Sequence, residues 1–399
     1  MESYIADWLN LLMRWLHLVT GVAWIGASLY FVWLDNHLVP ATPEEKERGV
    51  AGTIWSVHGG GFYNAKKYML GPKGEPLSDN LHWFKWEAYA TWMSGMGMLA
   101  IVYWWGASAY LIDPTVMALS VPQAIGISAA SLLAGWLVYD GLCRAVRNEA
   151  LLSALIFALV VVAAWAYSQV FGARAAYMHV GAMIGTIMVW NVFFHVIPGQ
   201  KKMVAAIRVG EKPEAKYGII GKQRSVHNTY FTLPVLFIMT SSHYPMTYGS
   251  KYGWSVLVAI SLAGVLIRQY FVLRHFGRAP AWLPAVAVTI LVLLAVAMAP
   301  SGSRSTGGAP AAAVPFARVQ AVITERCVSC HAEKPSFTGF AQPPGGVMLD
   351  TPERIQAAAQ RIHQQVVVTR VMPIGNLTKI TDEERALLGA WFAAGALTK

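Results

Sequence analysis

Charged residues are scarce in this chain of 399 residues, and its three cysteines are too few for a disulfide framework. Asp, Glu, Lys and Arg make up 13% of the sequence, whereas 55% is hydrophobic and the mean hydropathy is +0.43. Because soluble globular domains usually contain about 25% charged residues, the composition excludes an ordinary soluble protein. It predicts an integral membrane protein.

The first ten residues, MESYIADWLN, lack the basic region and the small-residue cleavage site of a signal peptide, which predicts a retained first helix. Eight apolar runs are close to the length of about 20 helical residues that crosses a bilayer. They lie at residues 9–34, 86–106, 122–140, 150–171, 178–197, 228–243, 252–273 and 281–299. The sequence therefore predicts an all-α protein whose membrane part is a polytopic bundle of about eight spans.

Basic residues are concentrated in alternate loops between these runs. One set of loops carries seventeen Lys and Arg residues, and the other set carries two. Because basic loops stay on the cytoplasmic side, both termini are predicted to be periplasmic, in a bacterial inner membrane. Basic loops on the cytoplasmic side of the lipid bilayer then account for the formal net charge of +10, and no nucleic-acid partner is required.

A stretch rich in Gly, Ser, Ala and Pro, APSGSRSTGGAPAAAVP, follows the last apolar run. Its composition predicts a flexible linker at residues 300–315, between a membrane domain at 1–299 and a small domain at 316–399. A domain of this size buries little apolar surface by itself. The tail is therefore expected to need a cofactor.

The segment TERCVSCHAEKPSF, residues 324–337, carries the other distinctive motif of the tail. In CxxCH, two thiols can attach to the vinyl groups of a haem and the histidine can bind its iron. This predicts one covalent haem c, attached at Cys327 and Cys330 with His331 as an axial ligand. A reactive dithiol and half of a zinc site are the alternatives, and for zinc the tail offers only His363 as a further ligand.

The second axial ligand is expected to be a methionine, either Met348 or Met372. Met372, in VMPIGNLTKIT, is favoured because the following proline fixes an extended turn that leads into the last helix. That helix is expected to begin at Thr381, with Glu384 completing a capping box. The order CxxCH, MPxGNxT and terminal helix resembles the small class I cytochromes c.

Histidines in or beside the apolar runs are the functional candidates of the membrane part. His179 and His243 would form one pair and His195 and His227 a second, each able to hold a haem b. The sixteen residues between the two histidines of one helix correspond to about 24 Å of rise but about 160° of rotation. Interfacial or hydrogen-bonding roles are the alternative, and His17 competes as a ligand.

The first long loop contains the strings WSVHGGGFYNAKKYML and LHWFKWEAY. Its glycines would let the backbone approach a flat anionic ligand, and histidine or lysine could move protons. It is not a phosphate loop, because the GK[ST] ending is missing. An interfacial amphipathic segment is the alternative. The candidates for substrate binding or proton transfer are His58, Lys66, Lys67, His82 and Trp83.

Several long strings, RWLHLVTGVAWIGASLYFVWLDNHL, HGGGFYNAKK, LHWFKWEAYATWMSG and IRQYFVLRH, together resemble the membrane-bound urate oxidases. In that family an eight-span domain is fused to a C-terminal cytochrome c. The resemblance implies that urate is oxidised to 5-hydroxyisourate, with water supplying the oxygen atom. It also implies that electrons leave through haem c to a downstream cytochrome or terminal oxidase, without making peroxide.

Other activities and the side of urate binding stay open. A module that passes electrons from quinol to cytochrome c is the main alternative, whereas the lack of a HisHis dipeptide disfavours a haem-copper reductase. A cytoplasmic urate site would lie about 30 Å from a periplasmic haem c. It would therefore require one or two haem b groups between them, and a periplasmic site would require none.

Overall fold

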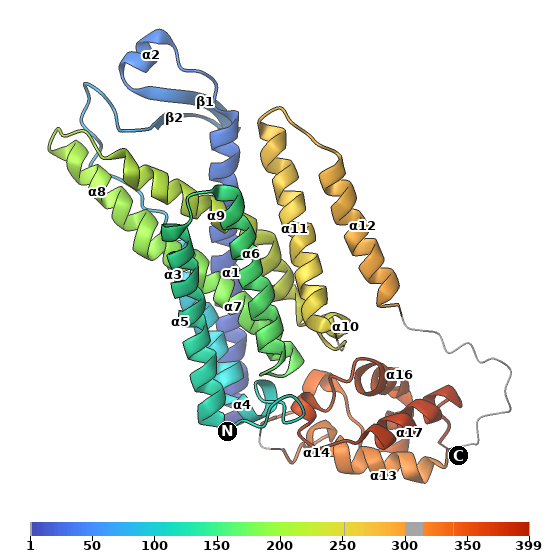
Figure 1. Ribbon diagram of the computed structural model, residues 1–399. Helices are drawn as coiled ribbons and strands as arrows, with labels where there is room; N and C mark the ends of the chain where they lie inside the picture. Colours follow the sequence, from blue (N-terminus) through green and yellow to red (C-terminus); the bar gives the residue numbers. More distant parts are fainter. Residues whose placement is uncertain (1, 251, 300–313, 338, 399) are drawn as a thin grey trace.

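The protein is a bundle of long helices with a small helical unit, the tail, at one end (Figure 1). The computed structural model describes residues 2–250, 252–299, 314–337 and 339–398. Most of the predicted linker at residues 300–315 lies outside the described residues.

Helices occupy the positions of all eight predicted apolar runs. They are α1 (Glu2–His37), α3 (Trp86–Met98) continued by the π-helix η1 (Leu99–Trp105), α5 (Val121–Ala145), α6 (Glu149–Ser168), α7 (Ala173–Asn191) continued by η2 (Val192–Val196) and α8 (Ile197–Arg208), α9 (Ala215–Ser241), α11 (Gly253–His275) and α12 (Trp282–Ala297).

Five of these segments are long and apolar enough to cross a membrane, which indicates a membrane protein. They are Tyr4–His37, Val121–Ala145, Glu149–Ser168, Ala173–Arg208 and Gly253–His275. The predicted number of eight is not confirmed. Helix α3 gives way to a π-helix, α12 has 16 residues, and the uncharged part of α9 begins only after Arg224.

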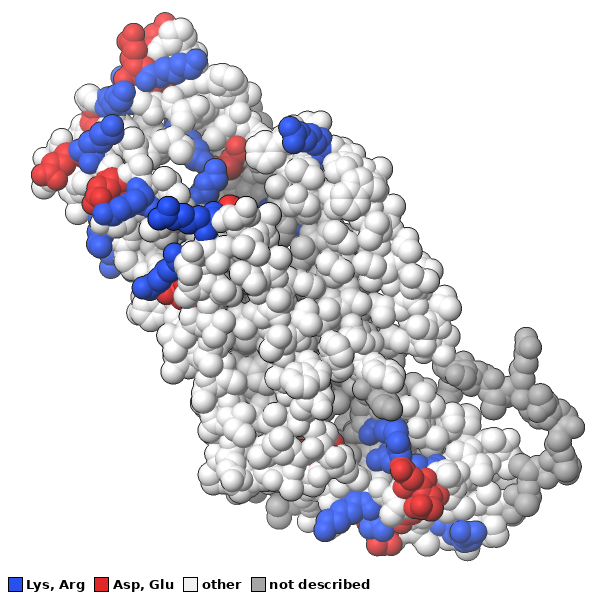
Figure 2. Space-filling model, in the orientation of Figure 1, with Lys and Arg blue, Asp and Glu red and all other residues white. Residues whose placement is uncertain are grey.

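The surface between the two ends of the bundle is nearly free of charge on the face that Figure 2 shows. Large apolar side chains are exposed along the helices, among them Val22, Leu137, Val162 and Leu293. So much exposed apolar surface is unfavourable in water, whereas the hydrocarbon core of a bilayer accommodates it. The charge distribution therefore agrees with the membrane prediction.

The two ends of the bundle carry different elements. The N-terminus, α4 (Ala107–Tyr110) and α10 (Pro245–Tyr248) lie at the end that contacts the tail (Figure 1). The first long loop, α8 and the connection from α11 to α12 lie at the opposite end, together with the basic loops. We call these the tail end and the hairpin end.

The first long loop contains a β-hairpin, which corrects the prediction of an all-α chain. Strand β1 (Val50–His58) pairs antiparallel with β2 (Gly61–Tyr68), after the short helix α2 (Pro43–Glu47). Gly59 and Gly60 have φ values of 58° and 80°, and a two-residue turn between strands favours positive φ at both positions. The glycine run is therefore explained by the turn.

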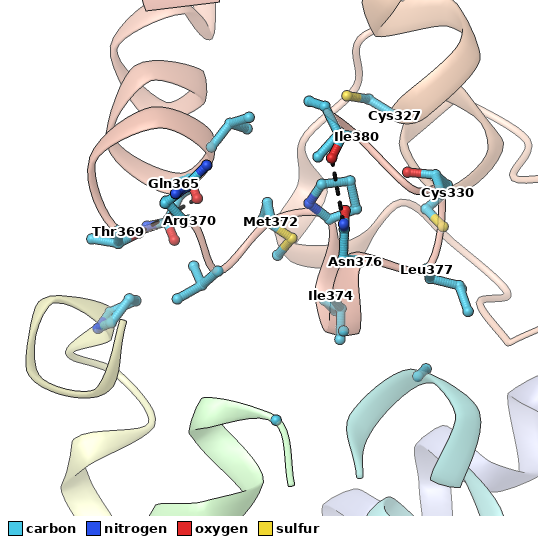
Figure 3. Close-up of a pocket in the computed structure, with 18 of the residues that line it drawn as sticks. Cys327, Cys330, Gln365, Thr369, Arg370, Met372, Ile374, Asn376, Leu377 and Ile380 are labelled. Atoms are coloured by element: carbon cyan, nitrogen blue, oxygen red, sulfur yellow. Dashed lines mark hydrogen bonds between the residues drawn. The ribbon is translucent and has the colours of Figure 1, made fainter. Parts of the chain in front are cut away.

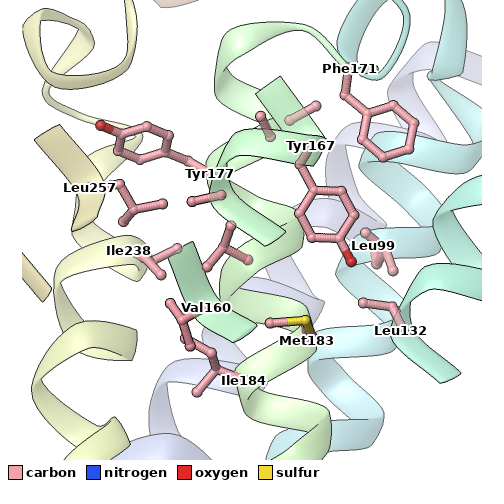
Figure 4. Close-up of a cluster of buried hydrophobic side chains, with 14 of the residues drawn as sticks. Leu99, Leu132, Val160, Tyr167, Phe171, Tyr177, Met183, Ile184, Ile238 and Leu257 are labelled. Carbon is pink, nitrogen blue, oxygen red and sulfur yellow. The ribbon is translucent and has the colours of Figure 1, made fainter. Parts of the chain in front are cut away.

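The hydrophobic core of the bundle surrounds α7 (Figure 4). Small residues let the neighbouring helices approach it, as is common between membrane helices. A Cβ atom at Gly135 of α5 would lie 2.6 Å from Cγ of Met183, and one at Gly181 would lie 2.6 Å from Cγ2 of Ile238. Helix α7 is thus held closely by α5 on one side and by α9 on another.

The tail has its own buried core. Its elements are α13 (Phe316–Arg326), α14 (Val328–His331), η3 (Pro344–Gly346), α15 (Pro352–Ala357), α16 (Ala359–Ile362), η4 (His363–Val368), η5 (Ile374–Asn376) and α17 (Asp382–Ala393). The core includes Val319, Ile323, Ile355, Leu388 and Trp391. The capping box at Thr381 is confirmed, because its hydroxyl accepts from the Glu384 N–H and the Glu384 carboxylate accepts from the Thr381 N–H.

Arg326 and Glu384 join α13 to α17. Nε and Nη2 of Arg326 lie 3.1 Å and 3.0 Å from Oε1 of Glu384. Burial alone would raise the pKa of the Glu384 carboxyl, but the hydrogen bonds from Arg326 and Thr381 outweigh it and lower that pKa. A carboxyl with a lowered pKa stabilises the fold above its unfolded-state pKa, and this contribution is lost as the pH falls through the folded-state pKa.

Glu384→Gln is therefore expected to destabilise the tail by about 1–2 kcal/mol at pH 7. The difference from the parent protein should shrink as the pH is lowered toward 4, because the parent carboxyl then begins to be protonated as well. Hydrogen exchange of tail peptides in the full-length protein measures both effects. Glu353→Gln, at an exposed position in α15, is the control. A difference that grows on acidification would contradict this assignment.

Candidate functional site

A cavity of about 890 Å³ lies between the tail and the tail end of the bundle. Cys327, Cys330, His331 and Met372 all line it, so the structure brings together the four residues that the sequence nominated for a haem. Figure 3 shows Met372 across the cavity from the two cysteines. Helix α14 and the residue before it position Cys327, Cys330 and His331, and the loop before η5 positions Met372. We call this space the large cavity.

The imidazole of His331 has a defined orientation. Its Nδ1 lies 2.9 Å from the carbonyl oxygen of Val347. A carbonyl can only accept, so Nδ1 carries the proton and Nε2 has its lone pair free. Histidines that bind metals almost always donate their other ring N–H in this way. The neutral imidazole of His331 is therefore oriented as in histidines that bind a metal through Nε2.

The position of Met372 is fixed through its backbone. Its N–H donates to the carbonyl oxygen of Gln365 at 3.0 Å, and Nη1 of the buried Arg385 donates to its carbonyl oxygen at 2.8 Å. Met348, the alternative ligand, is absent from the described residues that line the large cavity, although its neighbour Val347 is present. This geometry favours Met372.

The two thiols are poorly suited to a role as reactive thiolates. Burial raises the pKa of Cys327 to about 12, with a further contribution from Cys330, and burial also raises the pKa of Cys330. Reactive cysteines have lowered pKa values, so the arrangement disfavours the reactive-dithiol alternative. For zinc, no group of three His, Cys, Asp or Glu side chains within the described ranges is arranged to hold a metal ion.

A buried hydrogen-bond acceptor of Asn376 lies in the wall of the large cavity without a partner among the described residues. Oδ1 of Asn376 is buried and accepts no hydrogen bond from the described residues, whereas Nδ2 lies 3.4 Å from the carbonyl oxygen of Ile380. A buried acceptor without a partner is costly unless a bound molecule or water supplies a donor. The cavity therefore has both the ligand set and an unfilled hydrogen-bonding position for a bound group.

The bundle forms the opposite wall of the large cavity and contacts the loop that carries Met372. A Cβ atom at Gly375 would lie 2.6 Å from the carbonyl oxygen of Ile112, and one at Gly249 would lie 2.9 Å from Cγ1 of Val371. Val371 also packs against the core of the bundle. Two glycines thus let this loop lie directly against α4 and α10.

The predicted pair His179 and His243 does not have the arrangement of two free ligands. His179 is fully buried, with Nε2 at 2.7 Å from Oγ of Ser128 and Nδ1 at 2.8 Å from the carbonyl oxygen of Ala175. Both of its ring nitrogens are therefore engaged within the protein. His243 is exposed, just beyond the end of α9.

The other predicted pair lies in a buried polar cluster near the hairpin end. Nε2 of His195 is 2.7 Å from Oδ1 of Asp140, and Nη2 of Arg224 is also 2.7 Å from that oxygen. Nδ1 of His227 lies 2.8 Å from the hydroxyl of Tyr139. We call these five residues the buried ion cluster. Asp140 and Arg224 were not predicted from the sequence, although an acidic residue inside an apolar run is itself a sign of function.

His17 has a structural hydrogen-bonding role. Its Nδ1 lies 2.9 Å from the carbonyl oxygen of Thr91 and 3.2 Å from Oγ of Ser94, which connects α1 to α3. A Cβ atom at Gly95 would lie 3.1 Å from the imidazole, so this glycine makes room for the ring.

The candidates from the first long loop are dispersed. His58 is exposed at the hairpin turn. Lys66 and Lys67 form ion pairs with Glu45 and Asp35, at 3.0 Å and 2.6 Å. The imidazole of His82 is exposed and 3.7 Å from Glu87, and Trp83 packs against a small apolar cluster around Ala88. Their predicted roles in substrate binding or proton transfer stay predictions.

The comparisons with known proteins concern the bundle. A family model described as the urate oxidase N-terminal domain matches residues 3–299. No curated protein and no solved structure matches the chain. The matched range contains every helix of the bundle and ends before the tail begins.

Proposed function

Because the chain belongs to the urate oxidase N-terminal family, we propose that it oxidises urate to 5-hydroxyisourate and passes the electrons to a haem c in the tail. Urate and water give 5-hydroxyisourate, two protons and two electrons. The electrons would then go to a downstream cytochrome or terminal oxidase of the respiratory chain, without making peroxide. The family match supports the oxidation of urate, and the large cavity supports the route for the electrons.

We propose that Cys327 and Cys330 would attach the haem c by thioether bonds, and that Nε2 of His331 and the sulfur of Met372 would bind its iron. When bound, the haem supplies a one-electron acceptor, and His/Met ligation gives it a high reduction potential. The observation that carries this assignment is that all four side chains line one cavity, with Nδ1 of His331 already donating to Val347.

The remaining residues of the site position these groups and exclude water. Arg385 holds the carbonyl of Met372, and Val347 fixes the tautomer of His331. The contacts of Gly249 and Gly375 close the loop of Met372 against the bundle. A dry surrounding is one of the features that set the potential of a redox centre.

We also propose that the tail end faces the periplasm of a bacterial inner membrane. Basic loops stay in the cytoplasm, and they lie at the hairpin end. One or two haem b groups stay a prediction. The structure gives this prediction no support, because both ring nitrogens of His179 are hydrogen-bonded within the protein. His195 and His227 are likewise hydrogen-bonded to residues of α5.

Urate as the only reductant is expected to reduce the haem c of the anaerobic full-length protein, at two haems per urate. Stopped-flow absorption at the haem bands measures both the rate and the stoichiometry. The matched experiment uses a quinol in place of urate, because the alternative function transfers electrons from quinol to cytochrome c. Reduction by quinol and not by urate would refute the proposed oxidation and favour that alternative.

A further inference from the structure

A second cavity, of about 450 Å³, lies beside the large one. Small-molecule sites in proteins usually have volumes of about 300–1,000 Å³. Its walls come from the first turns of α1, the stretch from η1 to α4, the start of α7, and the tail between α14 and η3. We call it the small cavity.

The small cavity and the large cavity share a wall. Ala109, Tyr110, Arg174, Phe337 and Phe340 line both of them. The large cavity also holds the cysteines and the two expected axial ligands. A molecule in the small cavity would therefore be separated from a group in the large one by a single layer of side chains.

Two arginines make the small cavity suitable for an anion. Arg14 and Arg174 line it together with one acid, Asp7. Nε of Arg174 is buried and has no hydrogen-bond partner among the residues that the structure describes. Nη2 of Arg14 donates to Oδ1 of Asn10 at 3.1 Å, which orients the guanidinium through one of its five N–H donors.

Aromatic side chains make the small cavity suitable for a flat molecule. Trp105, Tyr110, Phe337 and Phe340 line it. The rings of Tyr110 and Phe340 are 6.5 Å apart, and the guanidinium of Arg174 lies 6.0 Å from the Tyr110 ring. Burial raises the pKa of the Tyr110 phenol, although Arg174 and Arg14 oppose it, so the hydroxyl is protonated at neutral pH and can donate.

We propose that the small cavity is the urate site, where Arg14 and Arg174 bind the anion and the aromatic side chains contact its flat rings. Urate is a planar purine and a monoanion near neutral pH, and a guanidinium both pairs with such an anion and stacks on flat rings. This inference rests on the proposed function and adds the place where the substrate binds.

The position of the small cavity removes the need for membrane haems. Substrate and electron acceptor lie on two sides of one wall at the tail end. The buried ion cluster is far from that wall, because Asp140 lies about 28 Å along α5 from Val121, where α5 begins at the tail end. Electrons from urate in the small cavity would not have to cross the membrane.

The test measures urate binding and electron acceptance separately, in the full-length protein. Arg14→Gln and Arg174→Gln are each expected to weaken urate binding by about 10–100-fold, because each removes a charged hydrogen-bond donor. Equilibrium dialysis of the ascorbate-reduced protein with labelled urate gives the Kd without turnover. The rate at which ascorbate reduces the oxidised Arg14→Gln protein measures electron acceptance by a group in the large cavity, which Arg14 does not line. Arg208→Gln, at the exposed hairpin end, is the matched control.

The possible outcomes separate this inference from the proposed function. If urate reduces the parent protein and both variants retain the parent Kd, the small cavity is not the urate site. If Arg174→Gln alters only the haem spectrum or potential, Arg174 serves the group in the large cavity. The Kd of Arg14→Gln then decides whether urate binds in the small cavity, because Arg14 lines only that cavity. Inorganic phosphate that displaces urate equally well would show a general anion site and overturn the proposal. If urate neither binds to nor reduces the parent protein, both proposals fail.

Discussion

Replacing His331 by alanine is expected to abolish the low-spin haem spectrum and to lower urate-dependent electron delivery by more than about 100-fold. Substitutions of residues that merely orient a metal ligand already cost about 10–100-fold in affinity or activity, and His331 is the expected ligand itself. The nitrogen that it offers is the one left free by Val347. The absorption spectrum of the reduced full-length protein and stopped-flow reduction by urate measure the two effects.

The tail offers matched controls for this experiment. His363 stacks on Phe392, with ring centroids 4.2 Å apart, and it is not among the described residues that line the large cavity. His363→Ala should therefore leave the spectrum unchanged. Met372→Ala and Met348→Ala form a second pair, of which only the first should perturb it. A normal spectrum in His331→Ala, or a perturbation by Met348→Ala alone, would contradict the ligand assignment.

Replacing Asp140 by alanine is expected to destabilise the bundle by about 3–5 kcal/mol, the usual cost of removing one partner from a buried ion pair. Arg224 is 2% exposed, and its Nη2 lies 2.7 Å from Oδ1 of Asp140. Without the carboxylate, a buried cation would have no counter-charge. The midpoint of thermal unfolding of the full-length protein in detergent should fall by roughly 5–15 °C.

Two further variants separate the loss of charge pairing from the loss of packing. Arg144 also contacts Asp140, at 2.6 Å, but its side chain is 72% exposed. Arg144→Ala should therefore cost less than about 1 kcal/mol. The double variant Asp140→Leu with Arg224→Met should regain much of the lost stability, because it removes both charges together. Equal effects of Asp140→Ala and Arg144→Ala would show that burial of the pair is not what matters.

The helices of the bundle were predictable because a long apolar run leaves a chain few alternatives to a helix in a membrane. The hairpin was not predicted, because β1 and β2 lack a regular alternation of apolar and polar residues and the glycines after His58 also suit a loop that binds a ligand. Gly59 and Gly60 instead adopt the positive φ values of a tight turn. Both interpretations use the same property of glycine, and the sequence did not decide between them.

The four residues of the large cavity that would hold a haem could be predicted from the sequence, because CxxCH and the methionine loop are compact motifs with fixed spacing. The small cavity could not, since Arg14, Tyr110, Arg174 and Phe340 lie in segments far apart in the chain. The packing of α1, α4 and α7 in the bundle, together with the docking of the tail, brings them to one cavity. The hydrogen bonds of His17 to α3 and of His179 to Ser128 of α5 could not be predicted for the same reason, because the partners lie far away in the chain.

The bundle and the tail both contribute to the wall of the large cavity, so the redox properties of the tail depend on the bundle. Part of the cavity wall belongs to the bundle, through Tyr110, Arg174 and Tyr248. A tail produced by itself would expose that side of the crevice to solvent, and solvent access changes the potential of a redox centre. A potential measured on the excised fragment would thus describe a wetter site than the one in the intact molecule.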